Sequence, residues 1–443
     1  MYLDENFQRL SAAYVAAHPA AFRAEAAQIK QTLRRPQRVL AFPPMVLSPA
    51  RFAEIERSAT ELVRLLSALP WRVFAGQVGP WMDFLGLDEA ARALLAPLAS
   101  AERLRQATCF ARPDMLPTAS GFRATEINVA SCIGGMGMLE RYLTAFQAGA
   151  FGRYLAAQGL HAAAPPTGAR WRQALAARTP VAAQAARPVI FEARANPADS
   201  NSGRANFIHM AEQAGFQVRC GLIGELTLRA DGVYAGAERI HTVYAMFTWD
   251  ELRRFVPAAL LLDLSALEQN GKVDLVLPLV TALFDHKANF EILSDPAFAH
   301  AFTAEEQQLL RRSIPATFRL RSETLADALA GQDQLVLKPT SQYGGKGIVI
   351  GKQVTAAEWR QRLAAASELG GYVCQQIVPD LWVRPALAGD DCPACLTALG
   401  PIVFDGRFSG VYLRQMPAQA ATPVINAANG AEDGIALGVM GGT

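Results

Sequence analysis

Residues 335–351 have the sequence LVLKPTSQYGGKGIVIG, and this stretch decides the fold that we expect. Two apolar runs flank a glycine-rich turn, so the pattern predicts strand, loop, strand. The glycines let main-chain N–H groups approach a polyphosphate closely. Lys338 and Lys346 would balance its negative charge. The glycines concerned are Gly344, Gly345 and Gly347.

The loop differs from two better known glycine motifs. The Walker spacing GxxxxGK[ST] is absent, and no helix is expected directly after Lys346. A dinucleotide fingerprint needs a strand followed by a helix. An ordinary glycine hairpin remains the alternative, and the two lysines favour phosphate binding over it.

A second group of polar residues lies far upstream. Cys109–Arg112 and Phe122–Asn128 are expected to be short strands, with turn residues between them over Pro113–Gly121. Glu126 and Asn128 are two apart, so their side chains share one face. Asp114 can reach that face if the strands pair. Two carboxylates and an amide oxygen suit Mg²⁺, although a polar sheet face with a turn aspartate is the simpler alternative.

Two weaker signals accompany these groups. Tyr372–Val378 is an apolar strand with a polar pair near its end, which could present backbone atoms to an adenine edge or simply be a buried strand end. Lys287 follows Asp285-His286 at an expected helix start, where a solvated lysine is the plain interpretation. Asn196, Asp199, Ser200 and Ser202 form a polar loop, which suits helix caps better than a ligand site.

Composition limits the classes of function. The chain has 443 residues, of which 51% are hydrophobic and 19% charged, so two or three lobes with ample cores are expected. A net charge of +2 without a dense basic run argues against nucleic-acid binding. No apolar run is long enough for a membrane helix and the first residues do not form a signal peptide, so a cytoplasmic location without membrane contact is expected.

Changes in composition and hydrophobic pattern along the chain divide it into three segments. Residues 1–186 are expected to hold a helical N-terminal region and the metal-binding part. Residues 187–262 alternate strands and helices and predict a small parallel α/β domain for substrate. Residues 263–443 would form the nucleotide-binding part with its glycine-rich lid. Among six cysteines only Cys392 and Cys395 have a suggestive spacing, and reduced loop cysteines are favoured over a zinc site because no second pair is near.

The order of these motifs resembles the ATP-grasp superfamily, and in particular its circularly permuted branch of eukaryotic-type glutathione synthetase and glutathionylspermidine synthase. Arg112-Pro113-Asp114, then Glu126-Ile127-Asn128, Ser131 and Gly134-Gly135 are similar to that branch's Arg-x-Asp, Glu-x-Asn, Ser and Gly-Gly run. The permutation explains why the metal residues precede the nucleotide loop. It implies an α/β (α+β mixed), permuted ATP-grasp fold with an inserted parallel α/β substrate domain.

The resemblance also implies roles for individual residues. It implies ATP and Mg²⁺ as cofactors, with Asp114, Glu126 and Asn128 on the metal and Arg112 and Lys346 as catalytic groups. It places substrate near Ser131, Arg414 and Asn426. ATP would contact Lys287, Lys338, Ser341, Gln342, Gly344, Gly345, Lys346, Gly347, Gln375, Gln376, Ile377 and Val378.

The sequence departs from that family at two places, the first at a metal ligand and the second at a substrate contact. Gln342 stands where the glutathione enzymes carry a metal-binding glutamate, so a metal held by Asp114, Glu126 and Asn128 alone is expected. Val424-Ile425-Asn426 replaces a basic pair that grips a substrate carboxylate in some relatives. This change weakens the case for a glutathione-type substrate.

The expected activity is therefore ATP-dependent joining of a small-molecule carboxylate to an amine through an acyl phosphate, which releases ADP and phosphate. A nucleotide-binding protein without catalysis and a kinase of a small carboxylate remain alternatives. The sequence leaves the oligomeric state open, with a homodimer as one option because relatives are often dimers. The sequence does not identify the acid or the amine.

Overall fold

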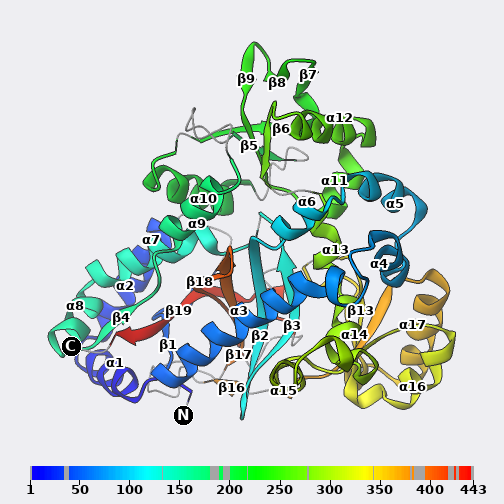
Figure 1. Cartoon of the computed structure of the whole chain (residues 1–443). Helices are drawn as coiled ribbons and strands as arrows, with labels where there is room; N and C mark the ends of the chain where they lie inside the picture. The colour runs from blue at the N-terminus through cyan, green and yellow to red at the C-terminus, as the bar shows by residue number, and fades with distance from the viewer. Residues whose placement is uncertain are drawn as a thin grey trace.

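The computed structural model describes residues 2–33, 39–131, 133–179, 189–192, 200–216, 218–276, 279–342, 344–379, 382–383, 395–417, 424–425 and 429–440. Four sheets and their helices make up this part of the chain (Figure 1). None of its helices combines the length and the apolar character needed to cross a membrane.

The largest sheet has eight strands and lies at the centre of the molecule (Figure 1). Its order is β1-β19-β18-β17-β2-β3, with β16 beside β17 and β4 beside β19. Neighbours are antiparallel except β1 and β19. The sheet thus joins early and late parts of the sequence. Its strands are β1 (Met45–Val46), β2 (Phe110–Thr118), β3 (Gly121–Val129), β4 (His161–Ala163), β16 (Trp382–Val383), β17 (Cys395–Phe404), β18 (Arg407–Pro417) and β19 (Glu432–Met440).

Helix α3 (Pro49–Arg72) crosses one face of this sheet (Figure 1). Its buried apolar residues recur three and four positions apart, which gathers them in one stripe toward the strands. The helical N-terminal region is confirmed by α1 (Glu5–Ala17), α2 (Pro19–Thr32), α3, α4 (Val78–Leu85), α5 (Glu89–Leu95), α6 (Ala101–Gln106), α7 (Met136–Ala148), α8 (Ala150–Ala157) and α9 (Thr167–Ala176).

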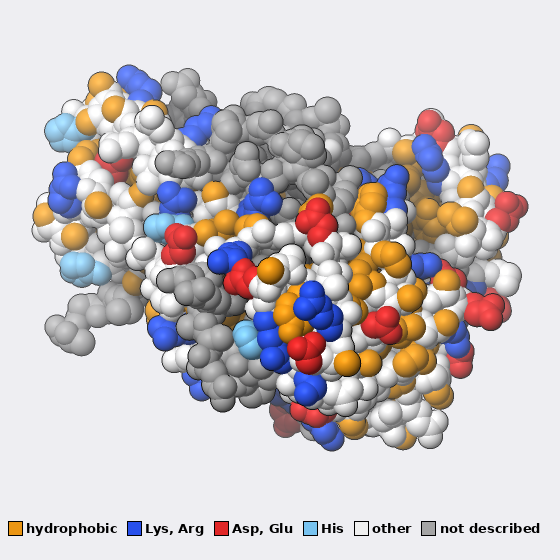
Figure 2. Space-filling model, turned by 90° about the horizontal axis from the view of Figure 1, so that it is seen from above, with side chains coloured by type: hydrophobic (Ala, Val, Ile, Leu, Met, Phe, Trp, Pro, Cys, Tyr) orange, Lys and Arg blue, Asp and Glu red, His pale blue; other side chains and the backbone are white. Residues whose placement is uncertain are grey.

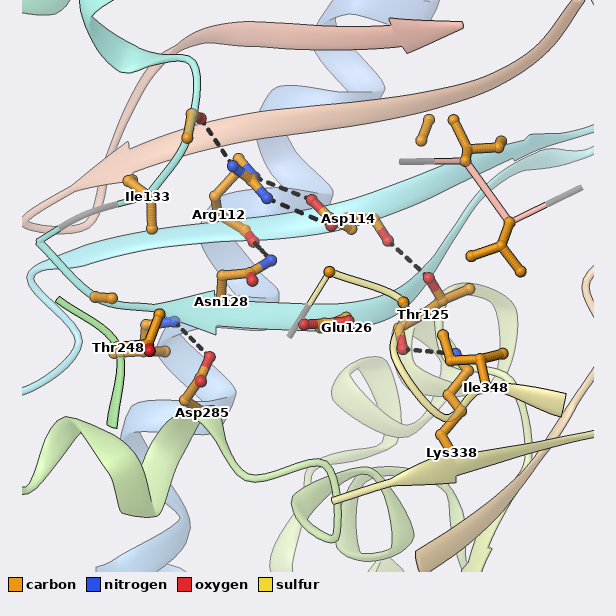
Figure 3. Close-up of a pocket in the computed structure, with 18 of the residues that line it drawn as sticks. Arg112, Asp114, Thr125, Glu126, Asn128, Ile133, Thr248, Asp285, Lys338 and Ile348 are labelled. Carbon is orange, nitrogen blue, oxygen red and sulfur yellow. Dashed lines mark hydrogen bonds and ion pairs between the residues drawn. The ribbon is translucent and has the colours of Figure 1, made fainter. Parts of the chain in front are cut away.

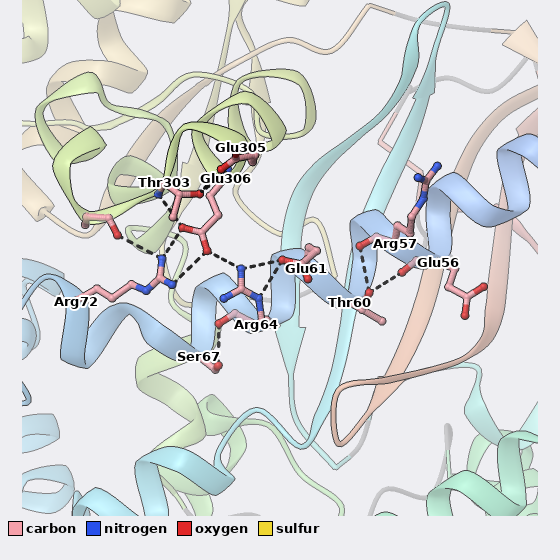
Figure 4. A network of polar contacts seen from close by, with 11 residues as sticks. Glu56, Arg57, Thr60, Glu61, Arg64, Ser67, Arg72, Thr303, Glu305 and Glu306 are labelled. Carbon is pink, nitrogen blue, oxygen red and sulfur yellow. Dashed lines mark hydrogen bonds and ion pairs between the residues drawn. The ribbon is translucent and has the colours of Figure 1, made fainter.

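A polar network fixes α3 to α15 (Ala304–Ser313) (Figure 4). Glu306 Oε1 lies 2.5 Å from Arg64 Nη2, and Glu306 Oε2 lies 2.6 Å from Arg72 Nη1. The hydrogen bond from Arg72, together with that from Arg64, lowers the pKa of Glu306 to about 2, although burial raises it. The network joins segments far apart in sequence.

A smaller parallel sheet has the order β11-β10-β5-β6, as the alternating pattern predicts. It extends beyond the predicted domain end at residue 262, because β11 pairs with β10. β9 ends at Ile240 and β10 starts at Thr242, and the two strands belong to different sheets. The elements are β5 (Val189–Glu192), α10 (Ser200–Gln213), β6 (Arg219–Leu222), β7 (Thr227–Arg229), β8 (Gly232–Ala235), β9 (Glu238–Ile240), β10 (Thr242–Ala245), α11 (Trp249–Phe255), α12 (Ala258–Gln269) and β11 (Asp274–Val276).

The predicted strand, loop and strand around the glycines are confirmed. β13 and β14 are antiparallel neighbours in a sheet of order β12-β15-β13-β14. A capping box between Thr355 and Glu358 starts the following helix where the sequence places it. This part contains α13 (Thr281–Asp285), α14 (Asn289–Ser294), α15, β12 (Thr317–Arg319), α16 (Leu325–Ala330), β13 (Leu335–Pro339), β14 (Val349–Ile350), α17 (Ala356–Leu369) and β15 (Tyr372–Gln376).

The turn expected over Pro113–Gly121 is wrong. β2 continues to Thr118, and only two residues separate it from β3. Pro113 is tolerated inside a central strand because it faces another proline. The register between β17 and β2, with Leu399 opposite Met115 and Val403 opposite Ala111, places Pro113 opposite Pro401. Neither proline has an N–H to lose.

Asp405 and Gly406 both have positive φ and form the turn that joins β17 to β18. Cys395 is buried in β17 and forms no disulfide, and Cys392 lies outside the described residues. On the face shown in Figure 2, basic and acidic side chains are interspersed among apolar and polar ones.

Candidate active site

The floor of the site is the hairpin of β2 and β3. Its register places Arg112 opposite Asn128 and Asp114 opposite Glu126, so all four side chains share one face of the sheet (Figure 3). A bulge after this pair leaves Thr125 unmatched. The Thr125 carbonyl therefore points to another partner, the Lys338 Nζ atom at 3.3 Å.

Two arginines hold Asp114. Its Oδ1 accepts a hydrogen bond from Arg112 Nε at 3.0 Å, and its Oδ2 accepts one from Arg414 Nη2 at 2.6 Å. Burial alone would raise the pKa of Asp114, but the charges of Arg112 and Arg414 lower it to about 2. The carboxylate stays ionised at neutral pH and is fixed in place.

Arg112 is itself placed by small residues around it. Its Nη1 donates to the Gly134 carbonyl at 2.7 Å. A Cβ at Gly400 would lie 2.7 Å from Arg112 Cδ, so glycine leaves room for this side chain. At Gly135 a Cβ would lie 2.3 Å from the ring of Tyr412, and φ is +93°. The predicted Gly-Gly pair thus has a packing role beside the site.

Two buried lysines approach the hairpin, Lys338 from β13 and Lys287 from the link between α13 and α14. Lys338 Nζ donates to Gln375 Oε1 at 2.6 Å, and burial lowers the pKa of Lys338 to about 8, partly offset by Glu126. Lys287 Nζ lies 3.4 Å from Glu126 Oε1 and 2.9 Å from the Gln342 carbonyl. Both lysines lie where negative phosphate oxygens would gain attraction.

These residues surround a cavity of about 540 Å³. Its lining includes the predicted residues Arg112, Asp114, Glu126, Asn128, Ser131, Lys338, Gly344, Gly345, Gln375, Gln376, Ile377, Val378 and Arg414. Gly344 and Gly345 have φ of 69° and 72°, which favour glycine. Gln375 also contacts the neighbouring strand β12, because its Nε2 donates a hydrogen bond to Thr317 Oγ1 at 3.0 Å.

Several predicted residues do not line this cavity. Ser341 and Gln342 line a second cavity of about 280 Å³, which lies beside Gly370, Gly371 and Tyr372. Lys346 and Gly347 are exposed. Lys287 contacts Glu126 but is not part of the lining. Asn426 and the loop with Asn196 and Asp199 lie outside the described residues, and the Ser200 and Ser202 side chains are not described.

Ser131 is occupied by a structural contact. Its hydroxyl donates to the Ala245 carbonyl, and its own carbonyl accepts from the Tyr244 hydroxyl at 3.0 Å. These bonds join the end of β3 to the small parallel sheet.

Sequence reasoning missed one side of the cavity. Phe247, Thr248, Trp249, Asp285 and Lys352 line it without having been assigned a role. A signal was present for the first three: a capping box of Thr248 and Glu251 directly follows β10, at the carboxyl end of a parallel strand where ligands usually bind.

The residues fit a magnesium ion only together with phosphate. Asp114 and Glu126 already face cations, and the described residues contain no group of three or more His, Cys, Asp or Glu side chains that could hold a metal alone. Mg²⁺ commonly uses one or two carboxylates and completes its shell with phosphate and water. The metal assignment stays a prediction that this donor set suits.

Comparisons with known proteins support the fold. A glutathione synthetase-like effector from Globodera pallida aligns over 93% of this chain and 96% of its own, at 11% identity and a TM-score of 0.59. A "putative gamma-glutamylcysteine synthetase" from Methylobacillus flagellatus aligns over 86% and 87%, at 13% identity and a TM-score of 0.43, too low to carry an argument. No family model and no curated protein matches the sequence. The chain therefore has a mixed α/β fold shared with a glutathione synthetase-like protein, which confirms the expected fold class, while the permuted order stays a prediction.

Proposed function

We propose that the protein is an ATP-dependent ligase that joins a carboxylate to an amine through an acyl phosphate. One observation carries this proposal: the hairpin with Asp114, Glu126 and Asn128 meets Lys338 and the glycine loop at one cavity, and Lys287 contacts Glu126, although these groups come from separate parts of the chain. The fold shared with a glutathione synthetase-like protein supports it.

Two bond exchanges make up the reaction. A substrate carboxylate oxygen attacks the γ-phosphorus of ATP, the bond between that phosphorus and the β,γ-bridging oxygen breaks, and ADP leaves. The amine nitrogen then attacks the acyl carbon, the bond from this carbon to the phosphate oxygen breaks, and inorganic phosphate leaves as the nitrogen loses a proton. The first step needs charge stabilisation rather than a covalent protein nucleophile.

The cations of the site match this need. Lys338 and Lys287 would bind phosphate oxygens, and Arg112 would stabilise charge at the reacting oxygen. Asp114, Glu126 and Asn128 would hold Mg²⁺, which when bound neutralises charge on the transferring phosphate. Lys346 is exposed in the described conformation, so its proposed contact with the γ-phosphate requires the loop over 340–347 to close.

Release of ADP and phosphate against a panel of acids and amines tests the function. We expect release only when an acid and an amine are both present, with an amide detected by mass spectrometry. ADP release with acid alone, accompanied by a stable phosphorylated acid, would identify a kinase instead. Tight ATP binding without turnover on any pair would exclude the ligase and favour a binding protein.

A further inference from the structure

One side of the main cavity is apolar and has no role in the reaction as described. It is formed by Phe247, Trp249, Leu252, Leu279 and Ala282, here called the apolar wall. Phe247, Trp249, Leu279 and Ala282 are only partly buried, and all four pack against the main hydrophobic core from the cavity side. When a ligand covers partly exposed apolar surface inside a cavity, the removal of that surface from water favours binding.

The wall offers few hydrogen-bonding groups: Trp249 has one indole N–H, and Thr248 and Thr281 lie beside the wall. Thr248 is occupied by the capping box: its N–H donates to Glu251 Oε2 at 2.9 Å, and its Oγ1 accepts from the Glu251 N–H at 3.3 Å. Among the described cavity-lining residues between 245 and 285, only Asp285 is charged.

Asp285 links this wall to the reaction centre (Figure 3). It is buried, and its Oδ1 accepts a hydrogen bond from the Val129 N–H at 3.0 Å, next to the proposed metal residue Asn128. This contact fixes Asp285, which also lines the cavity. A carboxylate can accept several hydrogen bonds at once, so a ligand's ammonium group could add to the contacts that Asp285 already has.

The rest of the cavity suits other parts of the reactants. Arg112 and Arg414 lie on the hairpin side and would attract a carboxylate. Val336, Ile348 and Ile350 lie beside Gln376–Val378, where the adenine is proposed to bind. The apolar wall with its single carboxylate therefore complements an amine with an apolar body.

We propose that the apolar wall binds the amine substrate, that this substrate is an amine carrying an apolar aliphatic or aromatic group, and that Asp285 receives its ammonium. This inference rests on the proposed ligase function for its biological meaning, but the binding itself can be measured without turnover. It differs from a glutathione-type reaction, whose substrates are polar.

Fluorescence titration of the full chain with ethylamine, butylamine, hexylamine and 1,4-diaminobutane tests the wall. Trp249 is the reporter, and a Trp249→Phe variant gives the background from the other tryptophans. We expect affinity to increase by about fourfold for each methylene group from ethylamine to hexylamine. The diamine, whose second charge would meet the wall, is expected to bind more weakly than butylamine. Equal affinity for all four amines would overturn the proposal.

Two variants, Leu279→Gln and Asp285→Asn, assign the contacts, and Leu262→Gln is the control. Leu279→Gln should remove the dependence on chain length, whereas Leu262→Gln, on the exposed side of α12, should retain it. Asp285→Asn keeps an acceptor for Val129 but lacks the charge, so it should weaken hexylamine binding at least tenfold and leave the binding of hexanol unchanged. If hexanoate binds better than hexylamine and Asp285→Asn does not weaken the amine, the wall binds the acid and the proposal is wrong.

Turnover separates this inference from the ligase proposal. With an active acid, Leu279→Gln should raise the KM for an apolar amine and leave kcat nearly unchanged. Failure of every acid and amine pair to release ADP would count against the ligase while the fluorescence titrations still decide the wall. Efficient turnover with polar amines only, at wild-type KM in Leu279→Gln, would overturn the wall and retain the ligase.

Discussion

Asp114 and Glu126 face each other across two strands, but their surroundings differ. Asp114 is held by two arginines, whereas Glu126 faces the single amine of Lys287. Glu126 therefore needs less rearrangement to accept a metal bound together with phosphate. This difference makes Glu126 the better position for a test of the proposed metal role.

We expect Glu126→Gln to reduce turnover at least a hundredfold with little loss of folding, because the amide retains the size and loses the charge. Phosphate release and thermal unfolding measure the two effects. Glu323→Gln, at an exposed position, is the matched control. Full activity in Glu126→Gln would refute the metal assignment.

The pH dependence of ATP binding should depend on Lys338. Its folded-state pKa is lowered from 10.5 to about 8, so the lysine is mostly protonated at pH 7 and loses its charge above pH 8. ATP binding should then require proton uptake, and the Kd should rise by up to about tenfold per pH unit above 8. Titration calorimetry between pH 7 and 9.5 measures this, and Lys338→Met should bind weakly with a flatter profile. An unchanged wild-type Kd across this range would contradict the proposed contact.

Residue spacing could predict part of the site. Glu126 and Asn128 share a face because strand side chains alternate, and Gly344 and Gly345 have the positive φ that a tight loop requires. Asp285 could not be assigned in this way, because its place on the cavity depends on how α13 packs against β3. The occupied hydroxyl of Ser131 was equally hidden, since its partner Ala245 lies far along the chain.

At the scale of elements, α7 and α10 cross at a glycine. A Cβ at Gly137 would lie 2.5 Å from the main chain of Asn206 and Phe207, and backbone cannot move aside as a flexible side chain can. This crossing holds α10, beside the parallel sheet, against α7 of the N-terminal region (Figure 1).

We expect Gly137→Ala to lower the free energy of unfolding by about 1–3 kcal/mol, because the added methyl overpacks the crossing. Gly79→Ala in α4, where a Cβ meets nothing within 4 Å, should be neutral or stabilising. Chemical denaturation of both variants measures the difference. Equal stability of the two would show that α10 moves freely relative to α7.

The contact of α3 with α15 should be sensitive to acid. Glu306 has a folded-state pKa of about 2, below its usual 4.5, so its stabilising effect is complete above pH 4.5 and is lost as the pH falls toward 2. We expect Glu306→Gln to lower the free energy of unfolding by on the order of 1 kcal/mol at pH 7. The difference in this free energy between the variant and the wild type should become smaller at pH 3. Denaturation at both pH values measures this; a gap that widens in acid would contradict the ion-pair explanation.

The element boundaries show why strand prediction was only partly right. Apolar runs and turn residues correctly located β13 and β14 on either side of the glycine loop. Proline was given too much weight as a turn former in β2, because the sequence does not show that Pro113 would face Pro401 across the sheet.

At the scale of the whole molecule, the site is an assembly of separate sheets. The metal residues lie on the eight-stranded sheet, Lys338 on the four-stranded antiparallel sheet, and the apolar wall next to the parallel sheet. The mixed fold class could be predicted from the order of motifs, but the domain end at 262 could not, since β11 pairs with β10 only in three dimensions.

A nucleotide that bridges these sheets should stabilise the whole chain. At a concentration a hundred times its Kd, ATP with Mg²⁺ should contribute about 2.7 kcal/mol and raise the Tm. AMP, which lacks the phosphates that reach Lys338, should give a much smaller shift, and Lys338→Met should reduce the ATP shift. Thermal unfolding followed by scanning calorimetry provides the test. Equal shifts with AMP and ATP would exclude phosphate contacts as the source.

The position of β2 beside β17 has a consequence for biosynthesis. A ribosome makes the hairpin of β2 and β3 long before it makes β17 and β18, so one edge of the nascent hairpin lacks its partner while the intervening residues are translated. Arg414 also reaches Asp114 only after β18 has been synthesised. The candidate site therefore cannot be completed before that point, and until then a chaperone has an unpaired strand edge to protect.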